Sequence, residues 1–367
     1  MAYIWESQEW YRFKWDAEKL SDLMSEVVYE QGRIIGQLEL LNLEHQNETQ
    51  LQALTEDVLK SSEIEGEILP TDQVRSSVAR RLGLDIGGLV ASDKNIDGIV
   101  EVLIDASVNY MERLSKDRLL GWHAALFPTG YSGIHKITVG NWRLDDAGPM
   151  QVVSGGIGKE KVHFEAPAAK TIPDEMEKFL SWFDSSALRD GPVKAGLAHL
   201  WFVTIHPFED GNGRIARALS DMVLSRSEKR GKRFYSMSSQ IREERKQYYE
   251  ILERTQKGWA DVHQWLEWFL GCLHRSILTS NETVSAVMVR ANFWQKFSQT
   301  PMNERQIKVL TKLLGNFEGK LTTSKWAKLA GCSQDSALRD IKDLVAHGAL
   351  SQDEGGGRNT SYSLAPQ

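Results

Sequence analysis

The sequence predicts a mainly α-helical protein with one small β-hairpin and a separate C-terminal unit. Hydrophobic residues recur at helical spacing through most of the chain. Residues 129–170 are instead rich in glycine and short β-branched runs, and residues 296–367 read as a compact unit of their own. A chain of 367 residues is long enough for two or three domains. We expect domain boundaries near residues 95 and 295.

The composition is that of a soluble globular protein, with 41% hydrophobic and 26% charged residues. A net charge of -6 argues against a chain devoted to nucleic acid, although it leaves room for one modest basic module. The N-terminus lacks the apolar core of a signal peptide, and no apolar run is long enough to cross a bilayer. Cys272 and Cys332 lie outside any metal-type spacing. We therefore expect a cytoplasmic protein without a membrane partner.

The N-terminal domain, residues 1–95, is expected to be helical over residues 16–67. Apolar residues recur at helical spacing within each of two runs. The second run ends in EIEGEILP, where Gly66 suits a helix C-cap and Pro70 follows shortly after. The second helix is thus expected to end near Gly66.

The central domain, residues 96–295, alternates helices with one irregular region. Residues 96–127 are expected to be helical, and QVV and KVHFE around SGGIGKE predict a hairpin. A surface hairpin without function is the alternative, but long loops inside helical domains are often functional. The stretch LAHLWFVTI is apolar almost all round, so it predicts a buried central helix that ends near Ile205.

Ionisable residues gather directly after that buried helix, in the stretch HPFEDGNGRIAR that begins at His206. Pro207 ends the helix, so His206 is expected at the rim of the core, where an imidazole can accept a proton near neutral pH. The glycine-rich turn and the helix start behind it offer backbone N–H groups to an anion. Arg214 and Arg217 lie three apart and suit phosphate oxygens, and Asp210 suits Mg²⁺ beside a phosphate. A capped helix with a satisfied histidine is the alternative.

This stretch resembles the signature of the Fic family, HPFx(D/E)GNGRxxR, at every fixed position. The resemblance implies a helical Fic-fold core with a β-hairpin flap, and transfer of AMP from ATP to a Tyr, Ser or Thr hydroxyl of a target protein or of the enzyme itself. It implies His206 as general base, Asp210 as Mg²⁺ ligand and Arg217 as γ-phosphate ligand. The residues implied to bind ATP phosphates are Gly211, Asn212, Gly213, Arg214, Ile215, Ala216 and Arg217.

The resemblance also implies roles outside the signature. The hairpin falls where the family has its flap, on which a target segment lies as an added strand. The flap residues implied are Val152, Val153, Val162 and Phe164. The segment from Met237 to Tyr249 falls where the family closes its adenine pocket. The adenine-pocket residues implied are Ser238, Ile241 and Tyr248, with ordinary helix packing as the alternative for the tyrosine pair.

A second motif, SSEIEG, spans Ser61 to Gly66 on a helix expected over residues 56–66. Glu65 sits at a helix C-terminus, where the helix dipole disfavours a carboxylate, so either water or a cation from elsewhere is expected to meet it. The spacing resembles the family's inhibitory motif, (S/T)xxxE(G/N). The resemblance implies that Glu65 pairs with Arg217 and keeps the enzyme largely off at rest. An alternative is that Glu65 and Mg²⁺ position water that removes AMP from a modified protein.

The C-terminal unit, residues 296–367, resembles a winged helix-turn-helix, with a tight turn at Gly331, a helix cap at Ser333 and a glycine-tipped hairpin. Residues 302–367 contain nine Lys or Arg and seven Asp or Glu, which is mild for DNA binding. The expected recognition helix carries three acids that should repel phosphates, namely Asp335, Asp340 and Asp343. We therefore favour protein contact or a homodimer over DNA. A nucleotide-sensing, DNA-binding regulator is the rival function.

Overall fold

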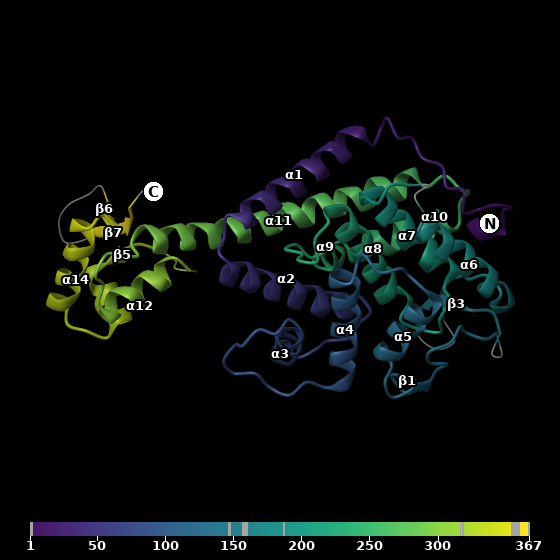
Figure 1. Ribbon diagram of the computed structural model, residues 1–367, viewed down its shortest axis with the longest axis horizontal. Coiled ribbons are helices and arrows are strands. Elements are labelled where there is room, and N and C mark those ends of the chain that lie inside the picture. Colours follow the sequence, from purple (N-terminus) through teal and green to yellow (C-terminus); the bar gives the residue numbers. More distant parts are fainter. Residues whose placement is uncertain are drawn as a thin grey trace. The chain divides into compact units, whose positions relative to one another are not determined.

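The computed structural model is mostly helical, as the sequence predicts (Figure 1). It describes residues 3–145, 148–155, 161–185, 188–315, 317, 319–353 and 360–365. These form two compact units. The larger comprises Met1–Gly36 and Gln46–Ser280, and the smaller comprises Gln37–His45 and Asn281–Gln367.

The larger unit contains the N-terminal helices, two small hairpins and the helical core. Its elements are η1 (Ile4–Glu6), α1 (Ser21–Glu39), α2 (Leu43–Ile64), α3 (Thr71–Arg81), α4 (Lys94–Val108), α5 (Lys116–Leu126), β1 (Tyr131–Ser132), β2 (His135–Lys136), β3 (Gln151–Ser154), β4 (Lys161–Glu165), η2 (Ala169–Thr171), α6 (Ile172–Phe183), α7 (Pro192–Ile205), α8 (Asn212–Glu228), α9 (Met237–Glu243), α10 (Arg245–Gln256) and α11 (His263–Lys296). The divisions between the units fall within α1, α2 and α11. The helices expected in residues 16–67 are α1 and α2, whereas α3 was not predicted.

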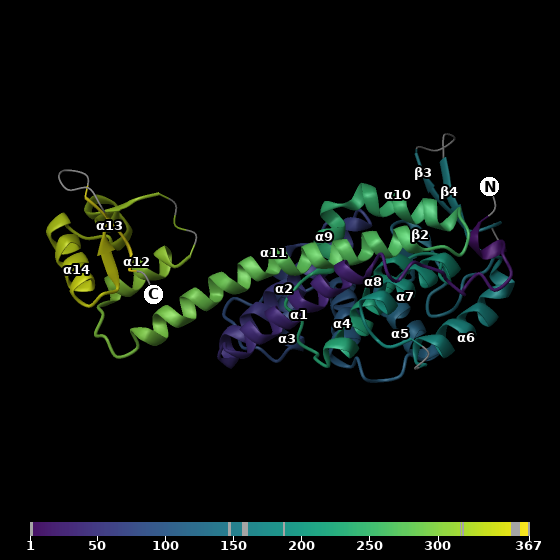
Figure 2. The same ribbon diagram turned by 90° about the horizontal axis from the view of Figure 1, so that it is seen from above.

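Helix α7 is the buried helix that the sequence predicts. Every residue of it from Ala195 to Ile205 is buried. It packs on α6 and α8, and α8 packs in turn on α4. Figure 2 shows α7 and α8 in the middle of the larger unit. The end of α7 and the start of α8 are therefore held by packing on several sides.

The predicted hairpin is the antiparallel pair of β3 and β4. Gln151 pairs with Glu165 and Ser154 with Lys161, with a register shift between Val152 and Val153. The tip of this hairpin, residues 156–160, lies outside the described residues. A shorter antiparallel pair, β1 and β2, lies in the same glycine-rich region. The irregular region thus carries two hairpins between α5 and α6.

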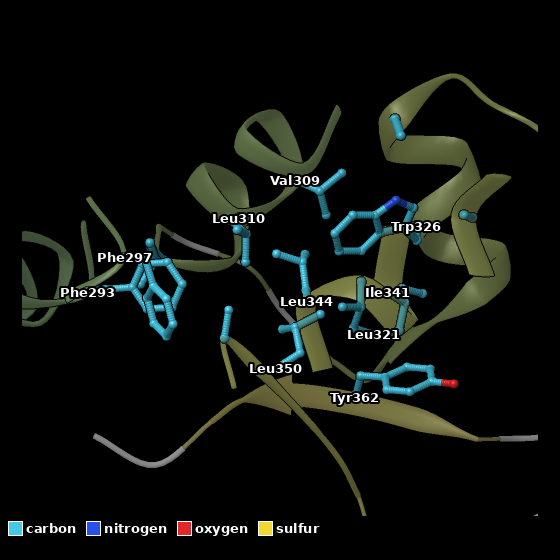
Figure 3. Close-up of a cluster of buried hydrophobic side chains, with 14 of the residues drawn as sticks. Phe293, Phe297, Val309, Leu310, Leu321, Trp326, Ile341, Leu344, Leu350 and Tyr362 are labelled. Atoms are coloured by element: carbon cyan, nitrogen blue, oxygen red, sulfur yellow. The ribbon is translucent and has the colours of Figure 1, made fainter. Parts of the chain in front are cut away.

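The smaller unit has its own hydrophobic core, to which the C-terminal end of α11 contributes (Figure 3). Its remaining elements are α12 (Glu304–Leu313), β5 (Leu321–Thr322), α13 (Thr323–Ala330), α14 (Gln334–Ala346), β6 (Leu350–Gln352) and β7 (Ser361–Leu364). The sheet order is β5-β7-β6, with both neighbouring pairs antiparallel. Trp326 of α13 and Leu344 of α14 are fully buried in this core. The predicted hairpin tip, residues 354–359, lies outside the described part of the chain.

The turn between α13 and α14 follows the prediction closely. Gly331 has a φ of 70° and ends α13, and Ser333 Oγ accepts the Ser336 N–H at 3.2 Å. Asp340, one of the acids expected to repel phosphates from this helix, is instead only 5% exposed. It accepts two hydrogen bonds from Arg305, at 2.9 and 3.0 Å. The exposed surface of α14 therefore carries less negative charge than the sequence suggests.

Across the described residues, no helix combines the length and the apolar character that a bilayer crossing requires.

Candidate functional site

The turn between α7 and α8 is held rigidly by its own side chains. His206 caps α7 in the left-handed region, with a φ of 51°. The Asn212 amide closes the turn, since it accepts the Phe208 N–H at 3.1 Å and donates to the Phe208 carbonyl at 2.8 Å. The Phe208 ring is fully buried and stacks on His123 with 4.1 Å between ring centroids. Phe208 is thus the anchor beneath the turn.

His206 is fixed in the tautomer that a general base needs. Its Nδ1–H donates to the Val203 carbonyl at 3.2 Å, which leaves the Nε2 lone pair free in the neutral ring. Burial lowers the pKa of His206 to about 4, and the nearby positive charge of Arg143 adds to this effect. The imidazole is therefore neutral at pH 7 and able to accept a proton.

This shift predicts the titration of His206. Because the charged form is disfavoured, the ring should stay neutral from pH 8 down to about 5 and take up its proton only at lower pH. The measurement is the NMR chemical shift of the ring protons against pH, assigned by comparison with His206→Gln. A midpoint near 6.5, the value of an unperturbed imidazole, would contradict the assigned environment.

At the start of α8, two glycines let neighbouring side chains approach the backbone closely. Gly211 caps this helix with a φ of 82°, and a Cβ there would lie 2.9 Å from the Phe127 ring. A Cβ on Gly213 would lie 2.3 Å from Glu65 Oε1. The first N–H groups of a helix have no partner within it, and they attract anions. The Glu65 carboxylate therefore lies against the N-terminal end of α8, where unpaired N–H groups favour a negative charge.

Arg217 is the most deeply buried cation of the signature, at 2% exposure. Its Nε donates to Ser61 Oγ at 2.9 Å, and its Nη2 donates to the Ser61 carbonyl at 2.9 Å and to Glu65 Oε1 at 2.8 Å. Burial opposes the charge of Arg217, but Glu65 outweighs it and raises the pKa of the guanidinium. Among the described residues Arg217 Nη1 has no hydrogen-bond partner. The structure thus brings Ser61, Glu65 and Arg217 together.

The turn after α2 explains why glycine follows Glu65. The Glu67 N–H donates to the Ser62 carbonyl at 3.0 Å, and the Gly66 N–H donates to the Glu63 carbonyl at 3.1 Å. This pair of bonds is a Schellman motif, whose left-handed position is usually glycine and sometimes asparagine. Gly66 occupies it with a φ of 89°. The helix expected over residues 56–66 therefore ends at Ile64, and Glu65 and Gly66 belong to the turn.

Two arginines from other helices meet the last carbonyls of α2. Arg217 of α8 donates to the Ser61 carbonyl, and Arg245 Nε donates to the Ile64 carbonyl at 2.7 Å. Cations stabilise this end of a helix, so they offset the dipole that disfavours Glu65. Sequence reasoning missed Arg245, because nothing local links it to a helix far earlier in the chain.

Asp210 lies at the edge of the turn. Its Oδ1 accepts the Gly211 N–H at 2.6 Å, and its Oδ2 bonds the hydroxyl of Ser132, the last residue of β1. The described residues contain no group of three or more His, Cys, Asp or Glu that could hold a metal. Mg²⁺ bound with phosphates needs only one or two carboxylates, so Asp210 fits that kind of site and stays a predicted ligand. Ser132 was not predicted.

The predicted adenine-pocket residues are buried. Ser238 and Ile241 are each 1% exposed and Tyr248 is 2% exposed. The Tyr248 hydroxyl is hydrogen-bonded to His199 Nε2 at 2.9 Å, and the Ser238 N–H donates to Asp57 Oδ1 at 3.2 Å. The side chains therefore pack as part of the core, and their role in binding adenine stays a prediction.

The flap strands have one anchored face and one open face. Phe164 is buried and packs edge-on against Tyr3, whereas Val153 and Val162 are 48% and 37% exposed. The pair of β3 and β4 forms a two-stranded sheet. Each strand of such a pair keeps one unpaired edge, which can accept an added strand. The role of Val152, Val153, Val162 and Phe164 in target binding stays a prediction.

Comparisons with known proteins place this geometry in context. Residues 113–224 match the Fic/DOC family, and residues 3–84 match a domain of unknown function (DUF4172). The chain is 28% identical over 169 residues to Protein adenylyltransferase fic-1 of Caenorhabditis briggsae, and 27% identical over 232 residues to Protein adenylyltransferase Fic of Aedes aegypti. These matches cover 45% and 62% of this chain and 30% and 41% of the relatives. The chain therefore spans less than half of either relative.

Two solved structures share the fold. A Fic family protein from Desulfovibrio desulfuricans G20 is similar with a TM-score of 0.53 and 20% identity, over 94% of this chain and 96% of that one. Fic-1 from C. elegans is similar with a TM-score of 0.50 and 20% identity, over 73% of this chain and 75% of that one. The predicted fold class is thereby confirmed.

Proposed function

We propose that the chain, whose residues 113–224 match the Fic/DOC family, transfers AMP from ATP to a hydroxyl side chain of a protein. The observation that carries the proposal is the pairing of two features at one turn. A neutral His206 with a free Nε2 lone pair ends α7, and an anion-binding helix start with Arg214 and Arg217 follows it. A base beside a polyphosphate cradle suits nucleotidyl transfer better than simple nucleotide sensing.

In the proposed reaction the target hydroxyl gives its proton to His206 Nε2. The oxygen of the target hydroxyl then forms a bond to the α-phosphorus. The bond between that phosphorus and the oxygen that bridges it to the β-phosphate breaks, and pyrophosphate leaves. The donors at the start of α8 and the two arginines would hold the phosphates in line with the attacking oxygen. Mg²⁺ held by Asp210 would neutralise charge on the phosphates. Positioning and charge neutralisation supply most of the acceleration in such reactions.

We also propose that the enzyme is inhibited at rest. A buried guanidinium needs an anionic partner, and Glu65 is that partner for Arg217 at 2.8 Å. In the inhibited state the Glu65 carboxylate pairs with the Arg217 guanidinium, which we assign as the ligand of the γ-phosphate. ATP can still bind, but its triphosphate cannot take the orientation that in-line attack requires. Any event that separates Glu65 from Arg217 would therefore activate the enzyme.

The position of the radioactive phosphate tests the transferred group. The Glu65→Gly enzyme incubated with a cell lysate and Mg²⁺ should label protein from ATP carrying label at the α-phosphate, and should not label it from ATP carrying label at the γ-phosphate. Label from the γ-position alone would show phosphate transfer instead. His206→Ala in the same background should remove the α-derived label, which distinguishes catalysis from tight nucleotide binding.

A further inference from the structure

We propose that Glu67 is a second acidic group that competes with nucleotide, acting on Arg214 as Glu65 acts on Arg217. Arg214 Nη1 donates to Glu67 Oε2 at 3.3 Å. The inference rests on the proposed function, because both arginines belong to the phosphate cradle. It assigns to Glu67 a role in nucleotide affinity.

The Schellman turn at the end of α2 is what presents two acids at once. The chain reverses its direction at Gly66, and the Glu67 N–H is fixed by its bond to the Ser62 carbonyl. Glu65 stands before the left-handed residue and Glu67 after it. The two carboxylates therefore reach two different arginines, one helical turn apart on α8. A single segment thus places two negative charges where a polyphosphate would place its own.

The Arg214 guanidinium lies in surroundings that favour an anionic partner, because it is largely buried. The residue is 9% exposed, and its Nε is buried without a hydrogen-bond partner among the described residues. Its guanidinium lies over the Phe127 ring at 4.9 Å, and the next carboxylate, that of Asp210, is 4.0 Å away. Glu67 makes the closer ion pair. A phosphate that binds Arg214 must therefore displace Glu67 or share the guanidinium with it.

The two acids are expected to differ in size of effect and in salt dependence. Glu67 is 46% exposed and contacts Arg214 near the rim of the site, whereas Glu65 is 31% exposed and contacts the more deeply buried Arg217. Salt screens exposed pairs strongly, and such pairs have small effects. Loss of the Glu67 charge should therefore tighten nucleotide binding by about two- to fivefold at low salt. The same change should have little effect on the rate of transfer once nucleotide is saturating.

The test is calorimetric titration of the full chain with ADP and Mg²⁺, comparing wild type, Glu67→Gln and Glu63→Gln. Glu63→Gln is the matched control, because it removes the same charge from the same helix end, where the side chain pairs with Lys60 and Arg242. We expect Glu67→Gln to bind ADP about two- to fivefold more tightly at low salt, with the gain lost at about 0.5 M salt. Glu63→Gln should bind like wild type.

Equal ADP affinity of Glu67→Gln and wild type at low salt would overturn the role of Glu67 while leaving the proposed function intact. An equal gain in Glu63→Gln would also overturn it, because the effect would then be one of overall charge. Absence of ADP binding in all three proteins would contradict the proposed function itself. In the Glu65→Gly background, Glu67→Gln should lower KM for ATP and leave kcat within about twofold.

Discussion

Replacement of His206 by alanine should lower AMP transfer by about 10²- to 10⁴-fold, the range for loss of a general base. The neutral imidazole offers the lone pair at Nε2, because its Nδ1–H is held by the Val203 carbonyl. Without this base, the target hydroxyl keeps its proton as it attacks. The groups that would donate hydrogen bonds to the phosphates lie on α8 and do not depend on the imidazole. Nucleotide affinity should therefore persist. Incorporation of α-labelled AMP and calorimetric titration with ADP measure the two effects separately.

A second substitution of His206 distinguishes loss of the base from strain in the backbone. His206 has a φ of 51°, a conformation that alanine adopts with strain and asparagine adopts more readily. His206→Asn should therefore keep the turn and still lose transfer. If both variants bind ADP and retain transfer within tenfold of wild type, His206 is not the general base.

Much of this site could be predicted from sequence because its residue types are required locally. Gly211 and Gly66 both have positive φ values, a backbone requirement that glycine meets. The apolar run of α7 is buried on all sides, which fixes where His206 must emerge from the core. These features depend on neighbours within a few residues, so a short stretch of sequence is enough to indicate them.

The parts that sequence did not predict depend on contacts between distant segments. Ser132 reaches Asp210, and Arg245 reaches the end of α2, across separations that no local pattern encodes. Asn212 was expected to bind phosphate, but its side chain closes the turn onto Phe208, so only its backbone N–H remains for a ligand. The direction of a side chain on a helix depends on how that helix packs, and a motif fixes only the residue type.

Replacement of Glu65 by glycine should raise AMP transfer by about ten- to hundredfold, as expected when a minor active arrangement becomes the major one. Arg217 would keep its bonds to Ser61 but lose the only carboxylate that pairs with it among the described residues. The space above Gly213 that Glu65 Oε1 occupies would open to phosphate oxygens. Autolabelling and lysate labelling with α-labelled ATP, compared with wild type at equal protein concentration, measure the change.

Two comparisons show whether the gain comes from the charge of Glu65. Glu65→Gln keeps the shape of the side chain and removes its charge, so it should activate less than glycine but more than Glu63→Gln, whose side chain lies away from Arg217. If Glu65 instead positions water that removes AMP, Glu65→Gly should abolish release of AMP from a modified protein in the absence of ATP. An unchanged rate of transfer together with lost AMP release would make removal the main activity. A raised rate of transfer in Glu65→Gly, absent in Glu63→Gln, would identify Glu65 as the group that ATP must displace from Arg217.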